Sequence, residues 1–199
     1  MKNAIILGSG NEGKIKEFRS ILGTGSITLF SWKDFDCPFS VREDGASFWE
    51  NAFRKASLTA QITGSVSVAD DSGLEVDYLN GRPGIFSARY AGAHATDQEN
   101  NDKLLRELEG VPFTKRGARF VCAIVIFSPE GKWERVEGEC RGIITENQQG
   151  SQGFGYDPIF LVPELGKTFA ELSAEEKNRI SHRARAIEKL RPLLTKYVS

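Results

Sequence analysis

Residues 4–14 read Ala4-Ile5-Ile6-Leu7-Gly8-Ser9-Gly10-Asn11-Glu12-Gly13-Lys14, and this segment indicates the class of fold. Four consecutive apolar residues that end at a glycine predict a buried strand. A helix is predicted to follow the glycine-rich turn, from about Lys14 to Leu22, and to end at Gly23. A strand, a tight turn and a helix in this order are typical of an α/β protein.

Farther along the chain, predicted helices and strands alternate and are followed by a hairpin. Capping-box spacing, in which Ser or Thr precedes Glu by three positions, marks three helix starts: Ser47 with Glu50, Thr96 with Glu99, and Ser173 with Glu176. The first two of these helices are expected to end at Gly64 and Gly110. Strands are predicted at 27–30, 66–69, 119–127, 133–145 and 159–162, with a hairpin turn at Glu130-Gly131. This order predicts a mixed sheet with flanking helices, in a single domain over residues 1–199 that has one core or two lobes.

Composition excludes several classes of protein. The chain has 199 residues, of which 40% are hydrophobic, and a compact chain of this length buries about 70% of its unfolded surface. Because 26 Lys and Arg residues face 27 Asp and Glu residues, the net charge is −1, so no nucleic-acid partner is expected. The longest apolar run, Phe120 to Phe127, is far too short to cross a membrane, and the start of the chain lacks a signal peptide. We therefore expect a cytoplasmic protein.

Cysteine and histidine residues show no metal-binding or disulfide pattern. Cys37, Cys122 and Cys140 are far apart, and the spacing of His94 and His182 does not suit zinc. Neither a disulfide framework nor a zinc site is expected.

The glycine-rich turn fits two nucleotide-binding patterns. As G-x-G-x-x-G it suggests a dinucleotide fold, with Asp34 near the expected ribose carboxylate. As G-x-x-x-x-G-K it suggests a P-loop, but Ile15 stands where that loop needs Ser or Thr. Both patterns predict a phosphate site at a helix N-terminus, with Ser9, Asn11 and Lys14 as further donors. The alternative is an ordinary tight turn with a solvated lysine.

Acidic residues in the first half of the chain suggest a metal site. Asp70 and Asp71 follow the strand predicted at 66–69 and are expected to lie in a turn. Hard carboxylate oxygens suit Mg²⁺, and Glu43, Asp44 or Glu50 could complete the site. Since successive strand residues face opposite sides, only one of the two aspartates should face a given cleft. The alternative is an acidic turn whose carboxylates cap backbone N–H groups.

Aromatic and basic residues in the second half could bind a base. Phe154-Gly155-Tyr156-Asp157 places two rings beside a carboxylate, and base–aromatic stacking is worth about 1–3 kcal/mol per base. The alternative is an aromatic loop that closes the core. Lys177, His182 and Arg183 converge only if the helical region breaks near 178–181, with Ser181 capping a second helix. Without that break they belong to a solvated basic helix.

Taken together, six blocks of sequence resemble the inosine/xanthosine triphosphate pyrophosphatases, the RdgB/Ham-type enzymes that remove deaminated nucleotides. The blocks keep the order and nearly the spacing of that family over essentially the whole chain: 7–14, Phe48-Trp49-Glu50-Asn51-Ala52, 69–74, 81–90, 153–158 and Ser181-His182-Arg183. The resemblance implies a long twisted mixed sheet with helices that form two lobes around a central cleft. It also implies Mg²⁺-dependent hydrolysis of dITP, ITP, XTP and dXTP to the monophosphate and pyrophosphate, by a homodimer.

The resemblance also implies roles for individual residues. Asp71 would be the catalytic proton acceptor and, with Glu43, a metal ligand. The triphosphate would be held by Ser9, Gly10, Asn11, Glu12, Gly13 and Lys14, with a further contact from Lys55. The base and sugar would be bound by Ser72, Phe154, Gly155, Tyr156, Asp157, Lys177, His182 and Arg183. Because Lys177 and Arg183 carry only donors, they would match the 6-oxo group of hypoxanthine or xanthine and leave the 6-amino group of adenine without an acceptor.

Two other functions fit parts of the sequence. A nicotinamide-dependent oxidoreductase would use the G-x-G-x-x-G turn and would bind NAD(P)H without Mg²⁺. A non-catalytic nucleotide sensor would bind a triphosphate and release no pyrophosphate.

Overall fold

A computed structural model describes residues 4–23, 28–34 and 41–198, and the chain divides into two compact units. The first unit comprises Met1–Ser72, Cys122–Gly138 and Arg183–Ser199. The second comprises Gly73–Val121 and Glu139–His182.

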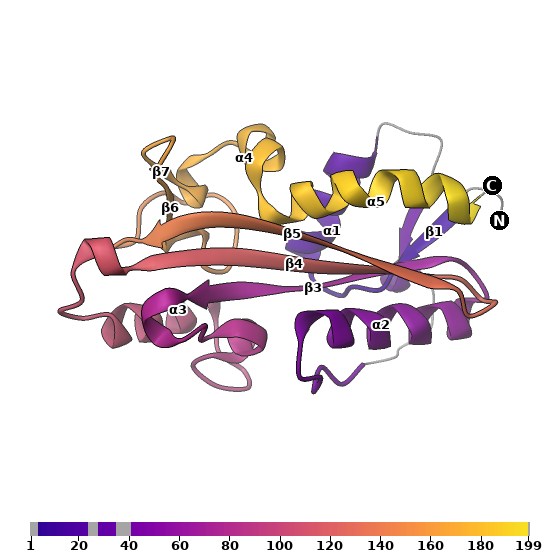
Figure 1. The fold of residues 1–199 in the computed structure, drawn as a ribbon, viewed down its shortest axis with the longest axis horizontal. Coiled ribbons are helices and arrows are strands. Elements are labelled where there is room, and N and C mark those ends of the chain that lie inside the picture. Colours follow the sequence, from indigo (N-terminus) through magenta and orange to yellow (C-terminus); the bar gives the residue numbers. More distant parts are fainter. Residues whose placement is uncertain (1–3, 24–27, 35–40, 199) are drawn as a thin grey trace. The chain divides into compact units, whose positions relative to one another are not determined.

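The helices and strands alternate in the first half of the chain, as predicted. Over all the described residues, the helices and strands in chain order are β1 (Ala4–Leu7), α1 (Glu12–Leu22), β2 (Thr28–Ser31), α2 (Phe48–Thr63), β3 (Ser67–Val76), α3 (Asp97–Glu107), β4 (Gly117–Phe127), β5 (Trp133–Ile144), β6 (Phe160–Val162), β7 (Lys167–Thr168), α4 (Ala174–Ile180) and α5 (His182–Val198) (Figure 1). Strand order in the sheet is β2-β1-β3-β4-β5-β6-β7. Because β1 pairs in parallel with β2 and β3 while β6 pairs antiparallel with β5 and β7, the predicted mixed α/β sheet is confirmed.

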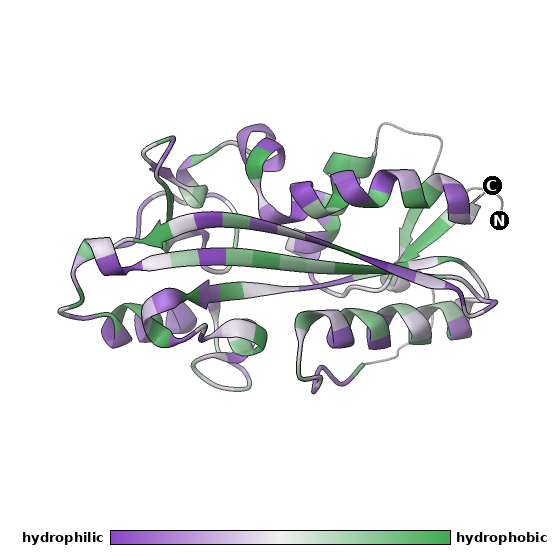
Figure 2. Cartoon of the chain, viewed as in Figure 1, coloured by the Kyte–Doolittle hydropathy of each residue, from purple (hydrophilic) through white to green (hydrophobic). Residues whose placement is uncertain are grey.

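Strand β1 has neighbours on both sides, which explains its unbroken apolar sequence. Ile6 lies opposite Phe30 of β2 and opposite Ser67 of β3. All four residues of β1 are buried, and Figure 2 shows the strand as hydrophobic along its length. A strand that is covered on both faces needs apolar side chains at every position rather than at every second one.

Helices cover both faces of the sheet in the first unit. On one face, Phe18 of α1 and Ile187 of α5 belong to a cluster that includes Val68 and Ile124. On the other face, small residues of α2 pack with the next residues of the same strands: Ala52, Ala56 and Ala60 with Ala69 and Val125. Successive strand residues point to opposite faces, so β3 and β4 each contribute to both clusters.

The second unit has a hydrophobic core of its own. Leu104 of α3, Phe120 of β4 and Phe160 of β6 are buried in it. Phe120 packs against Phe160 with ring centroids 4.6 Å apart, and it stacks on Phe169 at 5.8 Å with an interplanar angle of 7°.

Most predicted helix boundaries agree with the structure. Ser47, Thr96 and Ser173 cap α2, α3 and α4, and Gly64 ends α2 in the left-handed conformation at φ 60°. Helix α1 begins at Glu12 instead of Lys14, because Asn11 is the N-cap residue. Helix α3 ends at Glu107, three residues before the predicted Gly110.

The predicted turn at Asp70-Asp71 is wrong. Both residues lie inside β3, which continues to Val76 and is almost wholly buried. Charged residues are rare in a buried strand, so the pair resembled a strand end. Here ion pairs with side chains from other elements make the burial of these carboxylates tolerable.

Parts of the sequence-based predictions fall elsewhere. Ile27 and Cys37 lie outside the described residues, while Cys122 and Cys140 are buried and form no disulfide with another described residue. No helix in the described part of the chain is long and apolar enough to span a bilayer.

The first glycine of the turn is required by packing. A Cβ atom on Gly8 would lie 2.7 Å from Oγ1 of Thr59 and 3.1 Å from Cβ of Ala69. Thr59 is held in place because its hydroxyl donates to the carbonyl of Lys55 at 2.7 Å. Gly8 therefore permits the close approach of α2 to the end of β1.

We predict that Gly8→Ala lowers the free energy of unfolding by about 1–3 kcal/mol, because overpacking forces α2 or β3 to shift. Urea denaturation measures the change. Gly64→Asn is the control, since Gly64 has open space around its Cβ position and Asn tolerates a positive φ. Equal losses in the two variants would contradict this account of Gly8.

Candidate functional site

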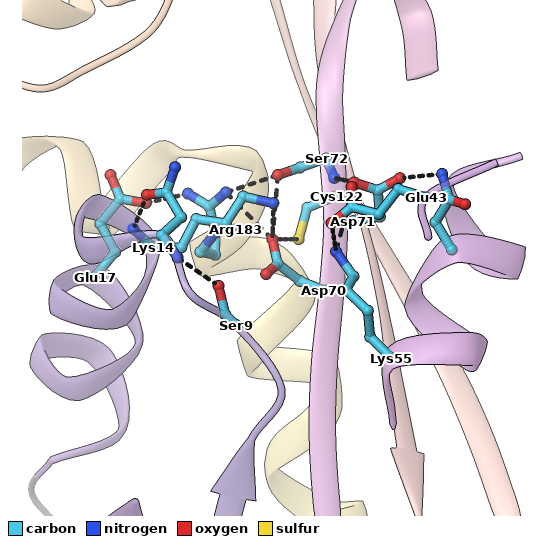
Figure 3. A network of polar contacts seen from close by, with 12 residues as sticks. Ser9, Lys14, Glu17, Glu43, Lys55, Asp70, Asp71, Ser72, Cys122 and Arg183 are labelled. Atoms are coloured by element: carbon cyan, nitrogen blue, oxygen red, sulfur yellow. Dashed lines mark hydrogen bonds and ion pairs between the residues drawn. The ribbon is translucent and has the colours of Figure 1, made fainter. Parts of the chain in front are cut away.

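A buried carboxylate at the centre of the first unit joins three distant parts of the chain. Oδ2 of Asp70 in β3 lies 3.1 Å from Nζ of Lys14 in α1 and 3.3 Å from Nη2 of Arg183 in α5 (Figure 3). The same guanidinium donates to Oγ of Ser72 at 2.7 Å and pairs through Nη1 with Glu17. The predicted residues Lys14, Ser72 and Arg183 therefore lie together.

The charges of this network determine how Asp70 titrates. Burial alone would raise the pKa of Asp70, but the nearby Lys14 and Arg183 outweigh it and hold that pKa well below its usual value. Burial opposes the charge of Lys14, yet Asp70 and Asp71 raise the pKa of its ammonium. Asp70 is thus a permanent anion that fixes two cations, and it is a poor candidate for a proton acceptor.

The neighbouring Asp71 has a different set of partners, as expected for successive strand residues. Its Oδ2 accepts from Nδ2 of Asn51 at 2.9 Å, and its Oδ1 accepts from the backbone N–H of Ser72 at 3.0 Å. Nζ of Lys55 lies 3.8 Å from Oδ1 of Asp71 and 3.2 Å from Oε1 of Glu43. Lys55 therefore bridges the two predicted metal-ligand carboxylates.

Asp71 is the carboxylate whose environment favours proton acceptance. Burial raises its pKa, and the charges of Lys55 and Lys14 only partly oppose that effect. A raised pKa makes a carboxylate a stronger base. Among the described residues, two hydrogen-bond donors reach its oxygens at 3.0 Å or less, although a carboxylate offers about four acceptor sites.

The site contains carboxylates of the kind that bind a divalent cation. Its ion pairs join Glu17, Glu43, Asp70 and Asp71 to Lys14, Lys55 and Arg183. Within the described ranges, no group of three or more His, Cys, Asp or Glu side chains could hold a metal alone. The pair Glu43 and Asp71 still suits Mg²⁺, which binds through one or two carboxylates together with phosphate oxygens.

The glycine-rich turn is shaped by its own side chains. Oγ of Ser9 accepts from the N–H of Asn11 at 3.3 Å, and Oδ1 of Asn11 accepts from the N–H of Lys14 at 3.0 Å. These two oxygens thus serve the turn and the helix cap, as the tight-turn alternative expects. Gly10 lies against Trp32, since a Cβ atom on Gly10 would lie 3.3 Å from the indole ring. Glu12 and Gly13 begin α1.

Neither named nucleotide-binding pattern fits the surroundings of this turn. Ile15 is 3% exposed and packs in the core, so it occupies no metal-facing position of a P-loop. Oδ2 of Asp34, the carboxylate that the dinucleotide pattern assigns to a ribose, accepts from the N–H of Ser31 at 2.7 Å and pairs with Arg19 at 3.1 Å. Asp34 is therefore engaged within the protein.

In the second unit, the structure brings Phe154, Asp157 and Lys177 together. Nζ of Lys177 lies 2.5 Å from Oδ2 of Asp157 and 4.9 Å from the centre of the Phe154 ring. The same Oδ2 atom accepts from the N–H of Phe154 at 2.9 Å. Tyr156 is buried and donates its hydroxyl to the carbonyl of Ser87 at 2.8 Å, so it closes the core as the structural alternative expects.

The predicted break in the C-terminal helical region is confirmed. Helix α4 ends at Ile180, Ser181 is extended at φ −65° and ψ 156°, and α5 begins at His182. His182 stacks on Phe120 at 4.7 Å with an interplanar angle of 12°. Phe120 in turn stacks on Phe169, and the Phe169 ring centre lies 5.4 Å from Nζ of Lys177. That Ser181 caps α5 remains a prediction.

The base-recognition role of Arg183 stays a prediction, and the structure shows which groups its guanidinium contacts. Its side chain is 1% exposed, and its Nη1 and Nη2 atoms contact Glu17, Asp70 and Ser72. A purine would have to compete with two carboxylates for these donors. In this structure Arg183 contacts Asp70 and Ser72, which it helps to hold in place.

Sequence reasoning missed two residues of the site. Asn51 is fully buried, donates to Asp71, and accepts from the N–H of Gly45 at 2.8 Å. Glu17 follows Lys14 by one helical turn and pairs with Arg183. The spacing of Asn51 and Lys55, four positions apart on one helix, was the available signal.

Comparisons with known proteins agree with this fold. The model of the Ham1 family matches residues 5–193. The chain is 49% identical over 187 residues to a dITP/XTP pyrophosphatase of Geobacter sulfurreducens, with 94% of both chains covered. A Clostridium perfringens protein of the same name is 48% identical over 192 residues, again with 94% of each covered.

Solved structures show the same fold. The Staphylococcus aureus Ham1 protein is 42% identical, has a TM-score of 0.86, and the match covers 97% of this chain and 98% of that one. A HAM1 protein from Coxiella burnetii is 41% identical, with a TM-score of 0.87 and the same coverage.

We predict that Asp70→Asn lowers the free energy of unfolding by about 3 kcal/mol at pH 7, because Lys14 and Arg183 lose a buried counter-charge. Since the folded pKa of Asp70 is lowered, its stabilisation is present above about pH 4 and is lost as the pH falls towards the folded value. Urea denaturation should therefore show a smaller difference from wild type at pH 3 than at pH 7. The exposed Asp44→Asn is the control, and a difference independent of pH would contradict this account.

We also predict that Asn51→Ala costs about 1–3 kcal/mol of stability, because a buried Asp71 oxygen and the Gly45 N–H each lose a partner. Thermal unfolding measures this loss. Replacing the exposed Gln61 by Ala on the same helix should have little effect. An equally stable Asn51→Ala protein would show that these two hydrogen bonds contribute nothing net.

Proposed function

Because the chain belongs to the Ham1 family, we propose that it hydrolyses dITP, ITP, XTP and dXTP to the nucleoside monophosphate and pyrophosphate. Support comes from relatives named dITP/XTP pyrophosphatase that match almost the whole chain. The single observation that carries the chemistry is that adjacent carboxylates have different partners. Asp70 pairs with Lys14 and Arg183, whereas Asp71 accepts from Asn51 and lies beside Lys55.

The triphosphate binds in the first unit in this proposal. The N-terminus of α1, with Lys14 one turn inside it, attracts phosphate oxygens through backbone N–H groups and charge. Residues Ser9 to Lys14 line this end of the helix, and Lys55 adds a second ammonium beside Asp71.

The proposal includes a divalent cation, because a triphosphate brings about four negative charges to a site that already contains the carboxylates Glu43 and Asp71. Glu43 and Asp71 would hold Mg²⁺, which when bound neutralises phosphate oxygens and the departing pyrophosphate. Lys55, which bridges the two carboxylates, keeps them at a fixed separation before any cation arrives.

Asp71 accepts the proton of the attacking water. Asn51 and the N–H of Ser72 orient its carboxylate, and burial makes it more basic than an exposed aspartate. Lys14, held by Asp70, stabilises the negative charge that develops on the leaving pyrophosphate.

The second unit binds the base. Phe154 offers a ring on which the base stacks, and Asp157 orients the ammonium of Lys177. That ammonium donates a hydrogen bond to the 6-oxo group of hypoxanthine or xanthine. Gly155, Tyr156 and His182 complete this wall of the site. Ser72 and Arg183 of the first unit, which share a hydrogen bond, also bind the nucleotide in this proposal.

Several coarser features belong to the same proposal. Residues 1–199 form a single functional domain, because β3, β4 and β5 each run without interruption through both units. The active form is a homodimer with a small-molecule substrate and no nucleic-acid partner, and it acts in the cytoplasm, where a nucleotide pool is found.

We predict that Asp71→Asn lowers kcat for ITP by about 10²–10⁴-fold, because the variant cannot accept a proton. Pyrophosphate release from ITP, XTP, dITP, ATP and GTP, with and without Mg²⁺, is the measurement. Asp77→Asn is the matched control, since Asp77 is exposed and pairs with the exposed Arg141 at 3.4 Å. Unchanged turnover in Asp71→Asn would remove Asp71 from the mechanism.

The same assay separates the rival functions. An oxidoreductase would bind NAD(P)H without Mg²⁺ and release no pyrophosphate. A sensor would bind ITP and release no pyrophosphate from it.

We further predict that Phe154→Ala raises KM for ITP about tenfold, because one stacking contact is lost. Inhibition by inorganic tripolyphosphate, which has no base, should not change. A parallel weakening of both would show that Phe154 supports the fold instead of the base.

A further inference from the structure

Helix α3 holds the loop at 153–157 from one side. Oδ2 of Asp97 accepts from the backbone N–H of Gly155 at 2.6 Å, and Nδ2 of Asn101 donates to the carbonyl of the same residue at 3.0 Å. Both polar groups of one loop residue are therefore bound by two side chains of one helix.

The spacing of the two side chains suits this task. Asp97 and Asn101 are four positions apart, so they lie on the same face of α3, one turn from each other. The helix itself is well fixed: Thr96 and Glu99 form its capping box, and Asn100 binds the N–H of Ala91 at 2.8 Å.

The loop needs an external anchor at this point. Gly155 has a φ of 63°, a conformation that residues with a side chain rarely adopt. In the chain it lies between Phe154 and Asp157, which recognise the base in the proposed function. Inside the loop, Asp157 accepts from the N–H of Phe154, and Gly153 leaves room for that carboxylate, since a Cβ there would lie 2.0 Å from Oδ2 of Asp157. These internal contacts set the shape of the loop but not its direction relative to α3.

We propose that Asp97 and Asn101 are positioning residues that set the base selectivity of the enzyme. This inference rests on the proposed function, in which Phe154, Asp157 and Lys177 recognise a 6-oxo purine. By holding Gly155, α3 fixes the plane of the Phe154 ring and the place where Asp157 meets Lys177. A small displacement of a recognition group weakens discrimination more than it weakens binding of the phosphates, which contact other residues.

The surroundings of Asn101 allow a clean test. Its side chain is 2% exposed, and its Oδ1 atom has no hydrogen-bond partner within the described residues. Replacing Asn101 by Leu removes the donor to Gly155 and also removes this unsatisfied buried acceptor, so the two effects on stability oppose each other. Asn101→Leu should therefore fold with a thermal midpoint near that of wild type.

The experiment measures kcat and KM for ITP and ATP in Asn101→Leu, Asp97→Ala and the double variant, at saturating Mg²⁺. We expect KM for ITP to rise about tenfold with kcat within twofold of wild type, and the ITP-to-ATP ratio of kcat/KM to fall by a similar factor. The inhibition constant of inorganic tripolyphosphate should stay unchanged. The double variant should be less impaired than the product of the single effects, because both side chains hold one residue.

Controls separate the possible outcomes. Gln98→Ala changes an exposed neighbour in the same turn, which contacts Asp102 of its own helix at 2.7 Å, and it should behave as wild type. Asp97→Asn keeps an acceptor for the Gly155 N–H and should restore selectivity relative to Asp97→Ala.

If Phe154→Ala changes selectivity while Asn101→Leu and Asp97→Ala do not, the positioning role is refuted and the proposed function stands. If Phe154→Ala also leaves selectivity unchanged, the base site and the inference drawn from it fail together. Loss of tripolyphosphate inhibition in the α3 variants would likewise overturn the inference, since it would indicate general unfolding.

Discussion

The ion pairs of Asp70 are the constraint on which the first unit depends. A carboxylate with no exposed surface in the middle of a strand is costly unless opposite charges surround it. Lys14 from α1 and Arg183 from α5 supply those charges, and Glu17 balances the second cation. The requirement for neutrality thus ties the glycine-rich turn, the central strand and the last helix together, and it leaves Lys14 positioned at the helix end that faces phosphate in the proposed function.

Strand geometry gives two consecutive residues, Asp70 and Asp71, a structural and a catalytic role in the proposed function. Because Asp70 and Asp71 point to opposite sides of β3, one carboxylate joins the charge network while the other meets Asn51 and Lys55 of α2. The close packing of α2, made possible by Gly8 and by alanines at four-residue spacing, brings those partners within reach. Packing of small residues is therefore what gives Asp71 its surroundings and its raised pKa.

The second unit solves a different physical problem, the presentation of a flat aromatic ring and an oriented ammonium. Its aromatic core of Phe120, Phe160 and Phe169 gives a rigid base on which Lys177 and His182 pack. Glycines at 153 and 155 allow the loop that carries Phe154 to turn tightly, and α3 anchors it. Rigid support of this kind is what discrimination between similar bases requires.

Local signals in the chain were enough to predict the α/β class, three capped helices, the hairpin and the helix break before His182, since each depends on residues close in sequence. The resemblance of six motifs to one family located most of the candidate site. Asp70 and Asp71 were misplaced in a turn, and Asn51, Glu17, Asp97 and Asn101 were assigned no role, because their contacts are with residues far away in the chain. Backbone preferences and capping act over a few residues, whereas the neutralisation of a buried charge and the anchoring of a loop depend on which segments the folded chain brings together.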